Sequence, residues 1–232
     1  MSSAVIRLYE IMLAAKKIPS ASEYINGWRL IFNAKNINET WRKIGLMHDL
    51  VEVAAQESME VSPNQKTNID YWKNQISAAL QNTTQGTQWQ HFIARIDQHT
   101  IGYLSAQATI SGLKINHSKI DKEKTNNAIR LLNESISEIY SSELEIGIKL
   151  CLIRRIRSLA NSLDDYIITG DEAIFDEFKI TAFDISSATK NKINIPAKSK
   201  IREGLAIVSD LMSTADGAIA LSAPIIQMLE NF

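Results

Sequence analysis

Apolar residues recur along this chain mainly at spacings of three and four, which is the period of an amphipathic α-helix. Alternation with period two, the pattern of a half-buried strand, rarely continues beyond four residues. We therefore predict an all-α protein, a multi-helix bundle of about nine helices with a long C-terminal helix. The predicted helices cover about residues 3–17, 22–31, 38–62, 67–81, 92–112, 121–140, 144–167, 169–185 and 201–229.

The segment 144–167 has the most regular apolar stripe of the chain, which extends over about six helical turns. The stripe consists of Leu144, Ile148, Leu152, Ile156, Leu159, Leu163 and Ile167, and it is widened by Ile146, Leu150 and Ile153. Because apolar residues cover so much of its circumference, we predict that this helix lies at the centre of the fold.

The last predicted helix repeats apolar residues in strict four-three alternation, which is the pattern of a coiled-coil seam. The seam consists of Ile201, Leu205, Val208, Met212, Ala215, Ile219, Ser222, Ile226 and Leu229. We predict that this seam packs against protein, in a partner or in a second copy of the chain. Met212, Ile219 and Ile226 are the candidate contact residues.

The same C-terminal helix has a second interpretation. Residues 205–229 carry two adjacent apolar stripes and a narrow polar face, which is also the pattern of a membrane-active helix. We favour protein contact because Asp210 and Asp216 are not offset by basic residues inside the helix. An anionic bilayer would repel such a face.

The aromatic residues suggest how the chain is divided. All four tryptophans, Trp28, Trp41, Trp72 and Trp89, precede residue 90, whereas the second half is rich in Ile and Leu. We predict a tryptophan-containing helical subdomain at 1–115 and an Ile- and Leu-rich helical subdomain at 116–232. One continuous domain is the alternative.

Charge and cysteine content narrow the classes of function. The 232 residues include 25 Lys and Arg against 26 Asp and Glu, a net charge of −1, so no overall field attracts nucleic acid or anionic lipid. The single cysteine, Cys151, excludes a disulfide framework within the monomer. The N-terminus lacks the uninterrupted apolar segment of a secretory signal, and we expect a cytoplasmic protein.

A metal or phosphate site is one interpretation of three residues on the predicted helix 92–112 and just before it. His91, Arg95 and His99 follow each other at intervals of four. On one helix the two histidines would be about 12 Å apart, too far to share an ion that needs bonds of roughly 2 Å. We predict no metal, no cofactor and no catalytic residue, and His99 is expected at the edge of the core.

Basic residues offer a candidate surface for phosphate or nucleic acid. The candidates are Arg95, Arg154, Arg155, Arg157, Lys198 and Lys200. No aromatic residues alternate with them as stacking platforms, and an acidic run from 164 to 177 is close in sequence. We predict that the arginines of 154–157 pair with these carboxylates, which argues against nucleic acid.

The acidic run also has a local explanation. Thr169-Gly-Asp-Glu172 matches a capping box that would start the helix 169–185, with Phe175, Phe178, Ala182 and Ile185 inward. Carboxylates in a first helical turn complement the helix dipole. The acidic residues that would contact a basic partner are Asp164, Asp165, Asp176 and Glu177.

The absence of any catalytic signature favours a non-enzymatic helical interaction module, such as an adaptor, an inhibitor or an immunity-type protein. Its partner would be another protein or a second copy of the chain. A membrane-active effector that uses 205–229 is the first alternative. A nucleic-acid-binding or hydrolytic protein that uses the basic residues is the second.

Overall fold

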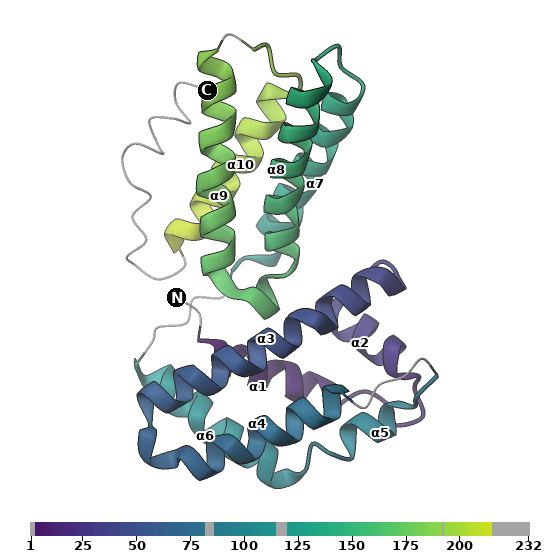
Figure 1. Cartoon of the computed structure of the whole chain (residues 1–232), viewed down its shortest axis with the longest axis vertical. Helices are drawn as coiled ribbons and strands as arrows, with labels where there is room; N and C mark the ends of the chain where they lie inside the picture. Colours follow the sequence, from purple (N-terminus) through teal and green to yellow (C-terminus); the bar gives the residue numbers. More distant parts are fainter. Residues whose placement is uncertain (1–2, 82–85, 115–119, 192, 215–232) are drawn as a thin grey trace. The chain divides into compact units, whose positions relative to one another are not determined.

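The computed structural model describes residues 3–81, 86–114, 120–191 and 193–214, and the chain divides into two compact units (Figure 1). Residues 2–116 form the N-terminal unit and residues 117–232 the C-terminal unit. The described residues contain ten α-helices, and their only β pairing is an isolated bridge between Glu23 and Gln88. The all-α prediction is confirmed, although the predicted number of helices is one too low.

The N-terminal unit contains six α-helices and one short 3-10 helix. In chain order they are α1 (Ala4–Ala15), α2 (Tyr24–Phe32), α3 (Ile37–Val61), η1 (Pro63–Gln65), α4 (Lys66–Gln81), α5 (Trp89–Ile93) and α6 (Gln98–Lys114). α1 and α4 each pack against both α3 and α6. Most of the core therefore lies between these four helices.

Side chains distant in sequence define where α1 begins. The carboxylate of Glu57, on α3, accepts hydrogen bonds from the Ser3 hydroxyl and from the Ala4 amide, the latter at 2.6 Å. The first amides of a helix have no partner within the helix, so a carboxylate at this position satisfies one of them. Glu57 thus adds to the local cap of Ser3, whose hydroxyl oxygen accepts the Ile6 amide at 3.5 Å.

Four aromatic side chains form a cluster where α2 meets α5. The ring of Trp89 lies 5.9 Å from Tyr24, 5.2 Å from Trp28 and 4.9 Å from Phe92, measured between centroids. The Trp89 indole N–H donates to the Ala15 carbonyl at 3.1 Å. Gly27 allows this packing, since a Cβ there would lie 2.5 Å from Cζ3 of Trp89.

The predicted helix 92–112 is in fact two helices, α5 and α6, separated by residues 94–97. Asp97 starts α6, because its carboxylate accepts the Thr100 amide at 2.6 Å and the Tyr71 hydroxyl at 2.5 Å. His91, Arg95 and His99 are therefore not on one helix, and all three are exposed. The prediction that His99 lies at the edge of the core was wrong.

Because a new helix begins after Asp97, the buried face of α6 differs from the one that the sequence pattern indicates. In the sequence, His99, Tyr103 and Ala106 have the spacing of an inward stripe, but α6 buries Thr100, Leu104, Gln107 and Ser111. Both sets have the four-three spacing of a helix stripe, so periodicity cannot choose between them. The position of the N-cap decides which set faces the core.

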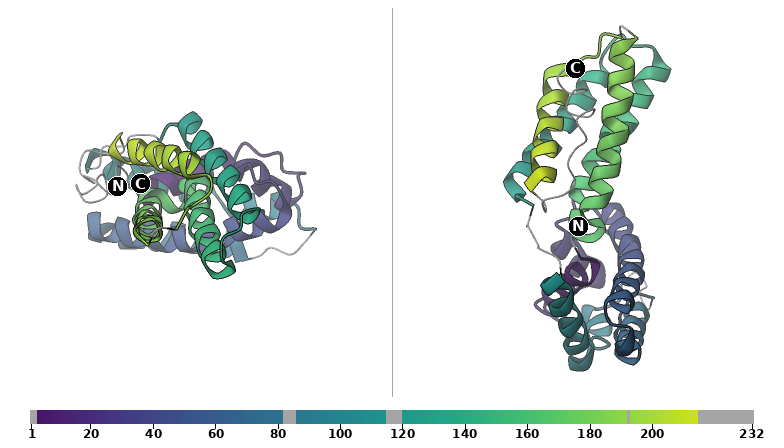
Figure 2. Two further views of the ribbon diagram at one scale, coloured as in Figure 1. Left: turned by 90° about the horizontal axis from the view of Figure 1, so that it is seen from above. Right: turned by 90° about the vertical axis from the view of Figure 1, so that its left-hand side faces the viewer.

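The C-terminal unit contains α7 (Lys122–Tyr140), α8 (Ile146–Asp164), α9 (Tyr166–Lys190) and α10 (Lys198–Thr214). α8 packs against α7 and α9, while α10 packs mainly against α7 (Figure 1). α8 and α9 form one layer of the unit, and α7 and α10 form the other. The right-hand view of Figure 2 shows α9 and α10 on opposite sides of the unit, in agreement with their limited packing.

Close packing and ion pairs join α10 to α7. A Cβ at Gly204 would lie 3.3 Å from Leu132, so the helices approach each other closely there. Lys200 bonds Glu138 at 2.6 Å, and Lys124 bonds Asp210 at 2.6 Å. The two bonds lie near opposite ends of α10, so the helices run antiparallel.

This packing accounts for the first half of the predicted C-terminal seam. Ile201, Leu205, Val208 and Met212 are buried in the core of their own unit. The rest of the seam, including Ile219 and Ile226, lies outside the described residues, as does most of the proposed membrane segment 205–229. Within the described ranges, no helix combines the length and apolar content needed to cross a membrane.

Two predictions about the centre of this unit were wrong. The stripe predicted over 144–167 ends with α8 at Asp164. Ile146 and Leu150 are 66% and 58% exposed, because the described helices that pack closely against α8 are α7 and α9. The capping box at Thr169 does not form as predicted. Gly170 has a φ of 79°, which interrupts α9 where the box requires a helical residue.

Candidate interaction surface

The predicted basic residues are divided between the two units. Arg95 belongs to the N-terminal unit, in the turn between α5 and α6, whereas the other candidates belong to the C-terminal unit. Lys200 is held between Glu134, at 3.2 Å, and Glu138, so it links α10 to α7. Lys198 lies at the first position of α10 and is exposed.

The three arginines of α8 have different environments. Arg155 donates from Nε to Asp184 of α9 at 2.5 Å. Arg154 and Arg157 are exposed, and neither forms an ion pair with a described residue. The prediction that all three pair with the acidic run 164–177 was wrong, because Asp184 lies outside that run and the other two arginines have no ion-pair partner among the described residues.

The acidic candidates also fail to form one continuous surface. Asp165 is only 4% exposed, whereas Asp164 is half-buried. Asp176 is exposed and pairs with Lys179 at 2.7 Å. Glu177 is half-buried, and its Oε2 is buried without a hydrogen-bond partner among the described atoms. The run is therefore divided between the interior and the surface of the C-terminal unit.

A different surface stands out on the outer side of α8 and α9. We call it the α8–α9 face, and it consists of Leu150, Arg154, Arg157, Ile180 and Phe183. Leu150 is 58% exposed, Ile180 40% and Phe183 60%. Spacings of three and four put the first three residues on one ridge of α8 and the last two on one ridge of α9.

A hydrogen bond and an ion pair between α8 and α9 show which residues of the two ridges lie beside each other. The Thr181 hydroxyl of α9 donates to the Arg155 carbonyl of α8 at 3.3 Å, and the Arg155 side chain reaches Asp184. Arg154 and Arg157 therefore lie at about the same height along the helices as Ile180 and Phe183. The face brings two cations, neither of them paired within the described ranges, beside large apolar side chains.

Sequence reasoning missed the apolar members of this face. Leu150 was included in the widened stripe of its helix, and its exposure depends on which sides of α8 have neighbours. Ile180 and Phe183 fall outside the predicted inward stripe of α9. Large apolar residues off the stripe were the available signal, since an exposed apolar patch often marks a contact surface.

The chemistry of the α8–α9 face suits binding more than catalysis. Its charged members are guanidinium groups, which neither accept protons nor bind metals near neutral pH. No group of three His, Cys, Asp or Glu in the part of the chain that the structure describes is placed to hold a metal ion. Arginine and aromatic residues are enriched at protein interfaces and among their energetic hot spots.

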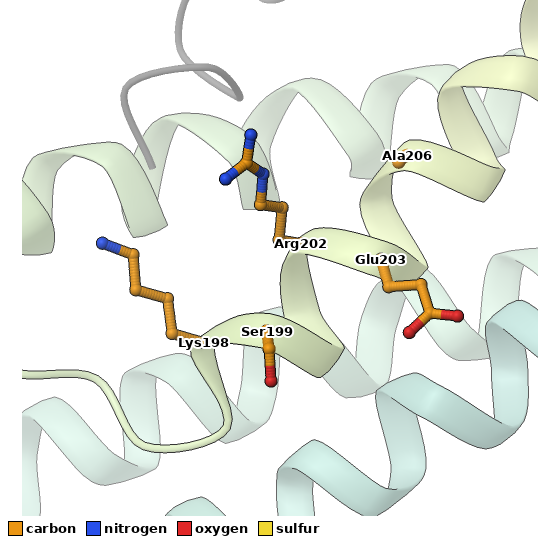
Figure 3. A pocket seen from close by; sticks show the side chains of 5 residues that line it. All are labelled: Lys198, Ser199, Arg202, Glu203 and Ala206. Atoms are coloured by element: carbon orange, nitrogen blue, oxygen red, sulfur yellow. The ribbon is translucent and has the colours of Figure 1, made fainter.

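A hollow beside α10 is a second candidate site (Figure 3). The described residues that line it are Lys198, Ser199, Arg202, Glu203 and Ala206. All five come from one face of α10, so they form a single wall. They do not define a ligand-binding centre.

The Asp97 cap in the N-terminal unit is the other cluster of titratable side chains. Hydrogen bonds from the Tyr71 hydroxyl and from the Thr100 amide lower the pKa of Asp97 to about 2, and the first of these bonds raises the pKa of Tyr71. Tyr103 packs edge-on to Tyr71 at 5.7 Å. These contacts fix the α5–α6 turn against α4, so we assign the cluster a structural role.

Replacing Asp97 with Asn is expected to destabilise the N-terminal unit by about 1 kcal/mol near neutral pH, because a charged cap accepts stronger hydrogen bonds. The pKa of Asp97 is about 2 when folded, against a usual 3.8. A lowered pKa gives stability that is complete above the unfolded value and lost as pH falls through the folded one. The difference in urea midpoint between wild type and variant should therefore shrink between about pH 4 and pH 2. A constant difference would contradict this role.

Fold and surface together define the class, an all-helical protein of two units with an exposed basic and apolar face. No family model, curated protein or solved structure matches the chain.

Proposed function

We propose that this protein is a non-enzymatic helical interaction module that binds a protein partner through the α8–α9 face. The observation that supports this most directly is the exposure of Leu150, Ile180 and Phe183 next to two arginines that have no ion-pair partner among the described residues. Covering such side chains removes apolar area from water at about 25 cal/mol per Å². A partner that also pairs with the arginines gains specificity from them.

Nucleic acid fits this face less well. Proteins that bind nucleic acid through phosphates typically make about six to ten phosphate contacts. The α8–α9 face offers two cations, Arg154 and Arg157, that have no ion-pair partner in the described part of the chain. The exposed carboxylate of Glu172 lies further along the outer side of α9, beyond Asp176, which pairs with Lys179. A protein surface can avoid these carboxylates, whereas an extended polyanion would be repelled by them.

Proximity labelling in the native cell tests this function with two variants. Phe183→Asp places a charge in the middle of the α8–α9 face. This variant is expected to lose labelling of the partner that the wild type labels. Leu30→Asp is the matched control, because Leu30 is 67% exposed on α2 in the other unit. The control should label the same partner as the wild type.

Both variants should keep wild-type circular dichroism, because both replaced side chains are mainly exposed. If Phe183→Asp folds normally and labels the same partners as the wild type, the α8–α9 face is not the contact surface and the proposal fails.

A further inference from the structure

We infer that the partner segment for the α8–α9 face is an amphipathic helix that carries carboxylates beside its apolar stripe. This inference rests on the proposed function and specifies the chemistry of the partner. It follows from three properties of the face, namely its charge, its dimensions and the position of its nearest carboxylates.

The charge of the face calls for anions. Arg154 and Arg157 are one turn apart on the same ridge of α8, and neither is neutralised by a described residue. Two acidic residues of α9 already have basic partners, since Asp184 binds Arg155 and Asp176 binds Lys179. A guanidinium group binds a carboxylate with two parallel hydrogen bonds, so carboxylates are the matching groups on a protein partner.

The dimensions of the face suit a short helix. From Ile146 to Arg157 the ridge of α8 rises about 16 Å at 1.5 Å per residue, which is about three helical turns. The apolar end of this ridge is formed by Ile146 and Leu150, and Ile180 and Phe183 flank its basic end from α9. A helix of about three turns could cover both, with apolar residues at spacings of three and four.

The carboxylates on α9 argue against an anionic membrane as the occupant. Glu172 and Asp176 are exposed on the same side of α9 as Ile180. A bilayer is flat and would meet these carboxylates together with the arginines, which reduces its attraction to the face. A helix is narrow enough to contact Arg154 and Arg157 alone.

Fluorescence anisotropy with the full chain tests this inference. The probe is a labelled three-turn helical peptide with leucines in one stripe and glutamates beside them. A charge-inverted peptide has lysines in place of the glutamates. The acidic peptide is expected to bind the wild type at least about tenfold more tightly than the basic one, because like charges at an interface are repulsive.

Charge reversal on the protein should reverse which of the two peptides binds more tightly. The double variant Arg154→Glu, Arg157→Glu is expected to bind the acidic peptide about tenfold more weakly than the wild type does. It should bind the basic peptide more tightly by a similar factor. Arg202→Glu, at an exposed position of α10, is the matched control and should leave both affinities unchanged. Equal binding of the two peptides, tighter binding of the basic one, or no binding of either would overturn the inference.

A second experiment measures whether the protein sediments with vesicles that contain phosphatidylserine. Sedimentation of the wild type with these vesicles, abolished by the double reversal, would favour a lipid surface and overturn the inference. The proposed function fails separately, through unchanged labelling by Phe183→Asp. If labelling is lost but the acidic peptide does not bind, the contact surface stands and the inferred partner chemistry is wrong.

Discussion

Replacing Ile156 with Asp is expected to unfold the C-terminal unit, with a loss of about 4 kcal/mol or more in the free energy of unfolding. Ile156 is 0% exposed in the middle of α8, and it belongs to the core that all four helices of the unit share. The change removes a buried apolar side chain and puts an unpaired carboxylate in its place. Domains are typically stable by about 5–15 kcal/mol, so the loss is a large part of the total.

Two spectroscopic probes separate the response of the units. All four tryptophans lie between residues 28 and 89, in the N-terminal unit, so their fluorescence reports on that unit. Circular dichroism should show a large loss of helix while the tryptophan emission stays native. Asn161→Asp is the control, because it introduces the same side chain at an exposed position of α8 and should change stability by less than about 0.5 kcal/mol. A native melt for Ile156→Asp would show that α8 is not packed as described.

The same substitution at two glycines is expected to have opposite effects. Gly27→Ala should destabilise the N-terminal unit by about 3 kcal/mol, because its Cβ would overlap the ring of Trp89. That ring is 0% exposed, is surrounded by other aromatic rings, and is tied to Ala15 by its indole N–H. It cannot move aside without losing these contacts.

Gly45→Ala supplies the comparison. Gly45 lies in α3 with no atom within 4 Å of an added Cβ, so alanine should raise stability by about 0.5–1 kcal/mol through its better helix propensity. Urea unfolding followed by tryptophan fluorescence measures both changes in the same unit. Equal and small effects at the two positions would mean that the α2–α5 aromatic cluster is not formed as described.

Packing between distant residues explains most differences between prediction and structure. The sequence of α6 has two stripes with helical spacing, and Asp97 selects the one with Thr100 and Gln107 because Tyr71 of α4 bonds its carboxylate. The break between α5 and α6 is also caused by this cap. A contact between residues 71 and 97 leaves no mark in the local period, so periodicity alone could not reveal it.

The sequence by itself determined that the chain is helical, where most of its helices lie and which side of α10 is buried. These properties depend on residues three and four positions apart, whose spacing states directly which side chains share a helix face. It did not determine which sides of α8 and α9 lack neighbours. The helices that pack beside α8 and α9 leave Leu150 and Phe183 exposed and bring Asp184 to Arg155, whereas Arg154 has no such partner among the residues that the structure describes. Exposure is a property of the assembled unit, so the α8–α9 face appears only in the tertiary structure.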